Sequence, residues 1–172
     1  MSTSPCALIV YSSLSGNTKE AANIIQEELI KAGFQVVVES IQCPQVKQEN
    51  EQKMYSQSEF NKFRFDVKAP VNDPRQFPLV LFGGPVWWYH LSPAVSGWIK
   101  QAKFDKLSTF GTFQQCGSEG YKEAFADVEQ LLGTKAEKVV IFDNDHKKTK
   151  GGMRDKLTNF VQTVVTAYKA TH

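Results

Sequence analysis

The sequence predicts an α/β fold: a doubly wound, five-stranded parallel sheet in the order 2-1-3-4-5 with helices on both faces. Two observations support this prediction. Short apolar runs alternate along the chain with longer segments of helical period, and glycine or proline punctuates most of the junctions. Because strand–helix–strand units cross over with a right hand, five such repeats place helices on alternate faces of one sheet.

The first half of the chain supplies three strands and one helix. Residues 7–11 form a first apolar strand, and residues 18–32 form an amphipathic helix that ends at Gly33. Valines dominate the second strand, 35–41, and the third, 79–82, is wholly apolar, as a central parallel strand should be.

The second half repeats the alternation. Ser92-Pro93 predicts a helix start, with serine as the cap and proline at the first helical position. Strand 108–113, helix 121–132, strand 138–142 and helix 153–170 follow. In this order of strands a ligand binds outside the carboxyl ends of the first and third strands. Three segments are therefore candidates for the site: 12–18, 83–90 and 112–120.

Composition predicts a single soluble domain over residues 1–172. The chain has 41% hydrophobic and 22% charged residues and a net charge of +2, too mild for a nucleic-acid surface. Neither an apolar run of about 20 residues nor a leader is visible, so we expect no membrane span and a cytoplasmic protein. Three cysteines without C-x-x-C spacing predict free thiols rather than disulfides or a zinc site.

The turn after the first strand has the composition of an anion site. Hydroxyls and a glycine precede a helix, where unpaired N–H groups and the helix dipole favour negative charge. The turn matches neither the Walker nor the dinucleotide-binding motif. It resembles the phosphate loop of flavodoxins, which binds the monophosphate of FMN, although Leu14 occupies a place where relatives often carry a hydroxyl. The alternative is a plain capping pair, Asn17 with Glu20. The resemblance implies FMN contacts at Ser13, Leu14, Ser15, Gly16, Asn17 and Thr18.

Bulky aromatic residues follow the third strand. Such surface suits a heteroaromatic ring, because tryptophan and tyrosine offer flat apolar faces with polar tips. The stretch 85–99 resembles the P-[LVI]-W-W…P-A…GWI segment of flavodoxin-like NAD(P)H:quinone reductases. Core packing is the alternative, and we expect one of the two tryptophans to serve it. The resemblance implies flavin contacts at Pro85, Val86, Trp87, Trp88 and Tyr89.

The third segment is rich in small and polar residues. Its position predicts that it closes over the flavin through Thr112, Phe113, Gln114, Gln115 and Gly117. The run 116–120 also comes within one residue of the G-x-S-x-G nucleophile elbow. A hydrolase would then use Ser118 with His146 and Asp143 or Asp145, a weaker hypothesis because it leaves the first turn unexplained.

Three further features remain open. His90 titrates in a range suited to protonating a bound ring, or it simply faces water. The basic turn of Lys147, Lys148 and Lys150 contacts an NADPH phosphate or is merely solvated. Residues 42–78 are long and aromatic, and they resemble the helix and loop that quinone reductases place beside the flavin and at their dimer interface.

These observations favour an FMN flavoprotein that uses NAD(P)H to reduce quinones or similar acceptors, with donor and acceptor taking turns in one pocket. With 18 acidic against 20 basic residues and no acid in 83–90, we expect little negative charge near the flavin. Alternatives are a flavodoxin-type carrier that docks on a redox protein, and a non-catalytic flavin-binding module. A homodimer is compatible with either enzyme or carrier.

Overall fold

The computed structural model describes residues 3–147 and 152–172 and contains a parallel sheet in the predicted order. Within the described chain, five parallel strands lie in the order β2-β1-β3-β5-β6, and the two-residue β4 pairs antiparallel with the end of β3. The predicted flavodoxin-like topology is therefore confirmed. The strands are β1 (Cys6–Tyr11), β2 (Gln35–Ser40), β3 (Leu79–Trp87), β4 (His90–Leu91), β5 (Thr109–Cys116) and β6 (Glu137–Phe142).

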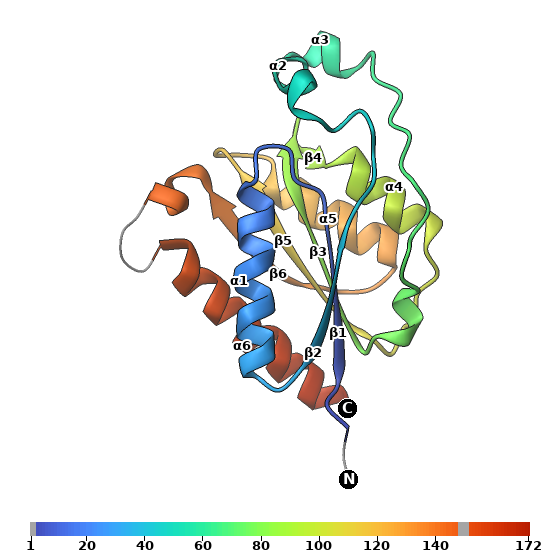
Figure 1. The fold of residues 1–172 in the computed structure, drawn as a ribbon, viewed down its shortest axis with the longest axis vertical. Helices are drawn as coiled ribbons and strands as arrows, with labels where there is room; N and C mark the ends of the chain where they lie inside the picture. The colour runs from blue at the N-terminus through green and yellow to red at the C-terminus, as the bar shows by residue number, and fades with distance from the viewer. Residues whose placement is uncertain (1–2, 148–151) are drawn as a thin grey trace.

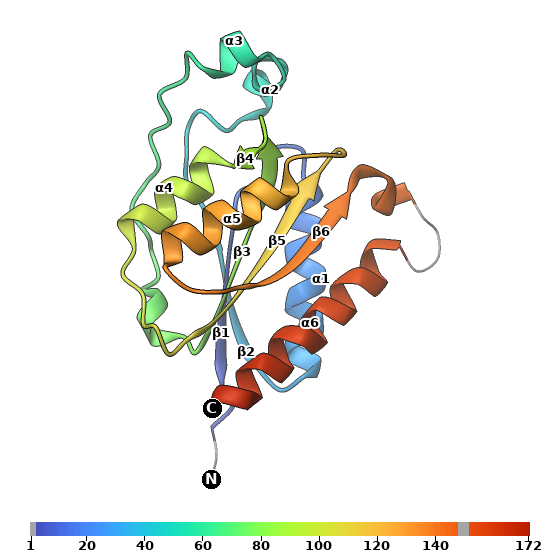
Figure 2. The ribbon, with the colours of Figure 1, turned by 180° about the vertical axis from the view of Figure 1, so that it is seen from behind.

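Helices cover both faces of this sheet. In Figure 1 α1 (Asn17–Lys31) and α6 (Gly152–Thr171) lie in front, and Figure 2 shows α4 (Pro93–Gln101) and α5 (Tyr121–Leu132) on the opposite face. Alternation along the strands builds the two cores: Ile9 and Leu81 pack toward α1 and α6, whereas Leu8 and Val80 pack toward α4 and α5. Both faces are thus sealed, which leaves the strand ends for a ligand.

The excursion between β2 and β3 rises above the carboxyl ends of the strands before it returns to the amino edge of the sheet (Figure 1). It carries only short helices: η1 (Gln48–Asn50), α2 (Glu51–Met54), α3 (Gln57–Phe60) and η2 (Pro74–Gln76). Met54 is fully buried, so α2 is held against the domain. The expected helix and loop beside the site are present.

A buried carboxylate holds the returning limb of this excursion. Glu39 of β2 accepts hydrogen bonds from the backbone N–H of Val71 and Asn72, at 3.2 and 2.8 Å, and from the Asn72 side chain at 2.8 Å. Trp98 of α4 donates its indole N–H to the same carboxylate at 2.5 Å. Four donors therefore compensate the desolvation of one buried charge.

Two strands extend further than the apolar pattern predicted. β3 continues to Trp87 and β5 to Cys116, because Gly84 and Pro85 pair with Gln114 and Gln115 in register. This pairing forms hydrogen bonds between backbone groups, which do not depend on the side chains. The polar residues of this stretch therefore gave no sign in the sequence that the strand continues. Residues 114–116, which follow the predicted strand 108–113, are therefore strand as well.

The start of α4 also differs from the prediction in one detail. Ser92 occupies the N-cap position before Pro93, but its side chain makes no capping hydrogen bond. Its hydroxyl is one of two buried polar side-chain atoms without a partner among the described residues, and the other is Oε1 of Gln114. Proline, rather than a capping side chain, marks where this helix begins.

The amino end of β1 and the carboxyl end of α6 lie together at the edge of the sheet opposite α2 and α3 (Figures 1 and 2). The hydroxyls of Thr109, at the start of β5, and Thr171, at the end of α6, are 3.5 Å apart. None of the helices in 3–147 and 152–172 has both the length and the apolar character that a membrane crossing requires.

Candidate functional site

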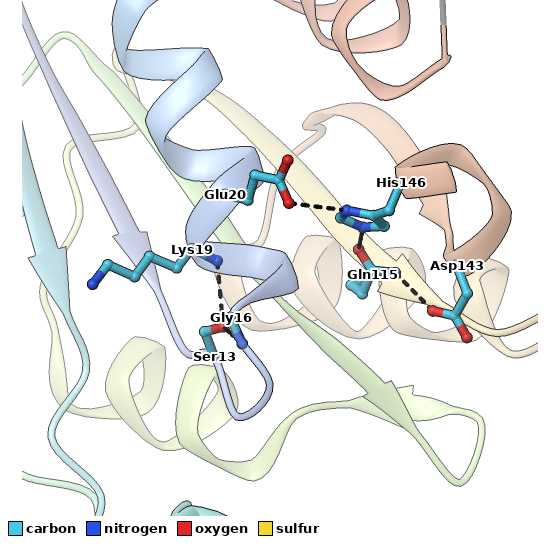
Figure 3. A network of polar contacts seen from close by, with 7 residues as sticks. All are labelled: Ser13, Gly16, Lys19, Glu20, Gln115, Asp143 and His146. Carbon is cyan, nitrogen blue, oxygen red and sulfur yellow. Dashed lines mark hydrogen bonds and ion pairs between the residues drawn. The ribbon is translucent and has the colours of Figure 1, made fainter. Parts of the chain in front are cut away.

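The β1–α1 loop is shaped by the side chain of Ser13. Its hydroxyl accepts hydrogen bonds from the backbone N–H of Gly16, at 3.2 Å, and of Lys19, at 3.3 Å (Figure 3). Gly16 is the N-cap in a left-handed conformation, φ 94°, which favours glycine. The predicted Asn17–Glu20 capping pair is wrong, because Asn17 is already the first helical residue and no side chain caps Gly16.

The same loop leaves a ring of donors open. Among the described residues no acceptor lies on the backbone N–H of Leu14, Ser15, Asn17 or Thr18. These four residues line a cavity of about 150 Å³, which we call the loop cavity. Unpaired N–H groups at a helix N-terminus, with the hydroxyls of Ser15 and Thr18 beside them, form a setting for an anion.

Four other segments complete the loop cavity. β3 contributes the stretch from Pro85 to Trp87, β5 and the residue after it contribute Gln115 to Gly117, the end of α2 contributes Tyr55, and the residue after β6 is Asp143. All of them except Tyr55 lie at carboxyl ends of parallel strands, where this topology places ligands. The first two candidate segments therefore meet at one cavity, joined by the middle of the third.

A second hollow, the aromatic cavity, opens beside the first and measures about 280 Å³. Tyr55, Val86, Trp87 and Gly117 border both cavities, so the two lie side by side and share these walls. Tyr55 and Tyr89 remain 59% and 52% exposed, which leaves aromatic surface uncovered at the rim. The residues that line only the aromatic cavity are Met54, Trp88, Tyr89, Ser118 and Glu119.

The aromatic walls come from an unusual turn. Trp87 pairs with His90, so Trp88 and Tyr89 are the two central residues of a hairpin, both left-handed at φ 53° and 67°. Such conformations cost about 1–2 kcal/mol for each non-glycine residue. Hydrogen bonds hold them: the Trp88 indole donates to the Met54 carbonyl at 3.0 Å, and the Tyr89 hydroxyl donates to Glu119 at 3.0 Å.

The packing of this turn against Gly120 leads to a stability prediction. A Cβ at Gly120 would lie 2.7 Å from the Tyr89 Cα and 3.1 Å from Val86, whereas a Cβ at Gly133 meets nothing within 4 Å. Both glycines have positive φ and flank α5. Chemical denaturation should show Gly133→Ala to cost about 1–2 kcal/mol. Gly120→Ala should cost about 1–3 kcal/mol more, because the turn must shift. Equal losses would mean that the turn is not packed as described.

Most of the predicted site residues do reach these cavities, but some do not. Thr112, Phe113 and Gln114 are fully buried strand residues that line neither cavity, so the prediction that they close over the flavin is wrong. The Phe113 ring fills the space above Gly83, where a Cβ would lie 2.0 Å from it. Ser13 and Gly16 shape the loop without lining the cavity. Those that line a cavity are Leu14, Ser15, Asn17, Thr18, Pro85, Val86, Trp87, Trp88, Tyr89, Gln115 and Gly117.

Both tryptophans line the aromatic cavity, and Trp87 also packs. It is buried, and its ring stands edge-on to Phe60 of α3 with centroids 6.1 Å apart. Trp87 is therefore the packing residue that was expected of one of the two tryptophans, and it borders the cavity as well. The excursion and the sheet share this wall.

Several cavity residues were not predicted as ligand contacts. Tyr55 lies in the excursion. Burial is the main cause that raises the pKa of its phenol, and the carboxylates of Glu51 and Asp143 raise it further. Glu119 follows β5, and the hydrogen bond to its carboxylate raises the pKa of the Tyr89 phenol. Asp143 follows β6, so its position at a carboxyl end was the available signal. Burial raises the pKa of the Cys116 thiol, which therefore stays protonated and is no nucleophile at neutral pH.

The structure contradicts the hydrolase hypothesis. Both ring nitrogens of His146 face other partners, Nδ1 toward Glu20 at 3.3 Å and Nε2 toward Gln115 at 2.7 Å. Within the described residues no hydrogen bond joins Ser118 to a histidine, so the pair that would activate a serine is missing.

The remaining two features stay outside the cavities. His90 is exposed, faces Asp127 at 3.1 Å and lines neither cavity. Of the basic turn, Lys147 is exposed, while Lys148 and Lys150 lie outside the described residues.

A larger hollow, about 570 Å³, lies on the other side of the β1–α1 loop. Ser12 and Ser13 border it, together with residues 40–44, 46, 47 and 68. Its two lysines pair with neighbouring carboxylates, Lys47 with Glu49 at 3.1 Å and Lys68 with Asp66 at 2.6 Å. Its lining includes neither the residues with open backbone N–H groups nor the aromatic residues of the other two cavities. We therefore do not take it as the ligand site, although its volume is greater.

Comparison with solved structures supports the fold. A candidate flavoprotein from Bacteroides uniformis superposes with a TM-score of 0.70 at 16% identity, covering 92% of this chain and 99% of its own. Rubredoxin oxygen:oxidoreductase from Desulfovibrio gigas gives 0.62 at 18%, and this chain spans only 38% of it. A Fusobacterium nucleatum flavodoxin bound to flavin mononucleotide gives 0.56 at 9%, with 94% of this chain covered and 98% of that one.

No protein-family model and no curated protein matches the chain. The structural likeness therefore identifies the fold and leaves activity to the site. The chain has the flavodoxin-like fold, a doubly wound sheet whose carboxyl edge carries a loop of open donors next to an aromatic cavity.

Proposed function

We propose that this chain is an FMN-binding flavoprotein. The observation that carries the proposal is that the loop cavity, with its four open backbone donors, shares walls with the aromatic cavity beside it. One end suits a phosphate and the other a flat heteroaromatic ring, which are the two ends of FMN. The residues present fit this group.

Each of the two cavities has a role in this proposal. The N–H groups of the β1–α1 loop and the hydroxyls of Ser15 and Thr18 hold the phosphate. On the wall of the loop cavity, Gln115 can donate or accept hydrogen bonds and Asp143 can accept them. Their partners would be the hydroxyl groups of FMN between its phosphate and its ring. Aromatic faces of the second cavity contact the ring, and water is excluded there. The ring-contacting residues are Tyr55, Trp87, Trp88 and Tyr89.

Flavin supplies hydride and electron transfer when it is bound, while the protein holds it and sets its potential. We propose that this chain uses it to oxidise NADH or NADPH and reduce quinones or similar acceptors. The exposed aromatic surface of Tyr55 and Tyr89 at the rim supports this activity, because planar donors and acceptors can stack there in turn.

A second candidate, an electron-transfer flavodoxin, is favoured by the local charge. Glu119 lines the aromatic cavity and Asp143 the loop cavity, and among the described residues no lysine or arginine lines either one. The expectation of little negative charge near the flavin, drawn from composition, is therefore wrong. Carboxylates disfavour added negative charge on a bound ring, which lowers its potential and suits a carrier.

Steady-state kinetics of the FMN-reconstituted protein separates these candidates. The reductase proposal predicts oxidation of NADH or NADPH in the presence of benzoquinone, with the parallel double-reciprocal lines of a ping-pong mechanism. Protein that binds FMN but oxidises neither nucleotide would instead support the carrier. Protein that takes up no FMN would refute both.

A further inference from the structure

Four side chains from separate parts of the chain form a continuous hydrogen-bonded chain behind the loop cavity (Figure 3). Glu20 of α1 contacts Nδ1 of His146 at 3.3 Å, and Nε2 of His146 lies 2.7 Å from Oε1 of Gln115. The amide nitrogen of Gln115 donates to Asp143 at 2.9 Å. Gln115 and Asp143 line the cavity, whereas Glu20 and His146 do not, so the chain connects the outer surface of α1 to the cavity wall.

The direction of each hydrogen bond follows from its two ends. An ionised carboxylate can only accept, so Asp143 fixes the amide nitrogen of Gln115 toward itself and leaves Oε1 toward His146. Because Oε1 also only accepts, Nε2 of the imidazole must carry a proton. The Glu20 carboxylate also only accepts, so Nδ1 must carry a proton as well. The chain is complete only when both ring nitrogens are protonated, that is, when His146 is an imidazolium.

The charged groups near this ring are consistent with that state. Glu20 of α1 is in direct contact with it. On η3 (Asp143–Lys147) itself, Asp143 bonds to Gln115 and Asp145 pairs with Lys156 of α6 at 2.6 Å, while Lys147 is exposed. β5 brings the neutral Gln115 and the protonated thiol of Cys116, and β6 ends at Phe142. Among the described residues, the charged group that contacts the ring is therefore a carboxylate.

We propose that His146 is a positioning residue, whose protonated ring holds Gln115 and Asp143 on the cavity wall in the arrangement that binds FMN. This inference rests on the proposed FMN function. Histidine side chains change charge between about pH 5 and pH 8, so the wall is ordered at the lower end of this range and released at the upper end.

Loss of the proton breaks the chain at one of two places. If Nε2 keeps its hydrogen, the lone pair of Nδ1 faces the Glu20 carboxylate and that contact opens. If Nδ1 keeps its hydrogen, the Gln115 amide must turn to donate to Nε2, and its oxygen then faces the Asp143 carboxylate. The first change leaves Gln115 bonded to the ring but frees the ring from its anchor on α1, and the second turns the Gln115 amide on the cavity wall. Both weaken the hold on the wall that the ligand contacts, so affinity for FMN falls as pH rises.

Binding of FMN to the apoprotein as a function of pH tests the proposal. For the wild type we expect affinity to fall about tenfold between about pH 6 and pH 8, the loss of one charge-assisted hydrogen bond. His146→Ala should bind about tenfold more weakly at the lower pH and show no dependence in this range. His146→Gln, which can donate an N–H to Gln115 but carries no charge to hold Glu20, should bind as the wild type does at the higher pH and also lack the dependence.

The matched control is His172→Ala, because His172 lies at the far end of α6, stacked on Tyr168 with centroids 4.5 Å apart. It should follow the wild-type pH profile. A flat wild-type profile, or a wild-type slope in His146→Ala, would overturn the proposal. Circular dichroism checks that each variant is folded, and His146→Gln keeps the test decisive if the alanine variant is not.

Nitrogen NMR of the apoprotein tests the hydrogen-bonded chain of Glu20, His146, Gln115 and Asp143 without any cofactor. The chain has three histidines, so each variant assigns its own signals. We expect the ring-nitrogen signals of His146 to change with pH, and the Gln115 amide and Asp143 carboxyl signals to move with them. Signals that do not move together would refute the positioning role. If the signals move together but no FMN binds, the proposed function is refuted, whereas the hydrogen-bonded chain of side chains is confirmed.

Discussion

Ser15→Asp should remove most of the FMN affinity that the proposed function predicts for this chain. Ser15 lies on the wall of the loop cavity, between backbone N–H groups that have no acceptor among the described residues. An aspartate there satisfies those donors and places a carboxylate beside the phosphate. We expect the dissociation constant to rise about 100-fold, about 3 kcal/mol, for like charges at close range. Fluorescence titration of the apoprotein measures it.

Riboflavin, which lacks the phosphate, serves as the matched ligand. Its affinity should change little in Ser15→Asp, because the aromatic cavity is untouched. Ser4→Asp is the control for added charge, since Ser4 is exposed and precedes β1, away from the carboxyl edge. An equal loss of riboflavin and FMN affinity would show that the loop does not bind the phosphate.

Trp98→Ala should produce the largest loss of stability. The side chain is fully buried and packs on Phe82 and Phe104, with ring centroids 5.9 and 6.4 Å away. Truncating such a residue costs about 3–5 kcal/mol, a large share of the 5–15 kcal/mol that stabilises a typical domain. The variant also takes one donor from the buried Glu39 carboxylate. Urea denaturation should show a much lower midpoint.

Trp98→Phe separates the two causes. It keeps most of the ring packing and removes the indole N–H, so we expect a cost of about 1–3 kcal/mol from the under-satisfied carboxylate. In a Glu39→Gln background the step from tryptophan to phenylalanine should cost less, because the charge is gone. If Trp98→Phe proves neutral in both backgrounds, the hydrogen bond to Glu39 contributes nothing to stability.

Local patterns in the sequence determined much of the fold correctly. The helix 121–132 was predicted residue for residue, since Phe125, Val128 and Leu132 repeat at helical spacing and Gly133 ends the helix. Alternation and handedness predicted a parallel sheet covered on both faces, and the resemblance to flavodoxins supplied the strand order that the structure has. Strand ends were less accurate, because cross-strand pairing extended β3 and β5 into polar and proline-containing sequence.

The site shows the same division between local and distant information. The β1–α1 loop and the aromatic stretch are contiguous in sequence, so their motifs could be read. Tyr55 and Asp143 meet across the loop cavity from segments far apart in the chain, and only the folded structure brings them together. Trp88 and Tyr89 are not the residue types that usually form a two-residue hairpin turn, so the sequence did not predict one. Hydrogen bonds to residues distant in the sequence support their left-handed backbone instead.

The shared location of the start of β1 and the end of α6, at the edge away from α2 and α3, has a practical consequence. A tether attached at either terminus would fix the protein to a bead or an electrode with its two cavities facing solution. A polypeptide fused at either end would leave from the same edge and would not obstruct diffusion of small molecules to the opposite one. Immobilised and fused forms should therefore keep the ligand affinity of the free protein.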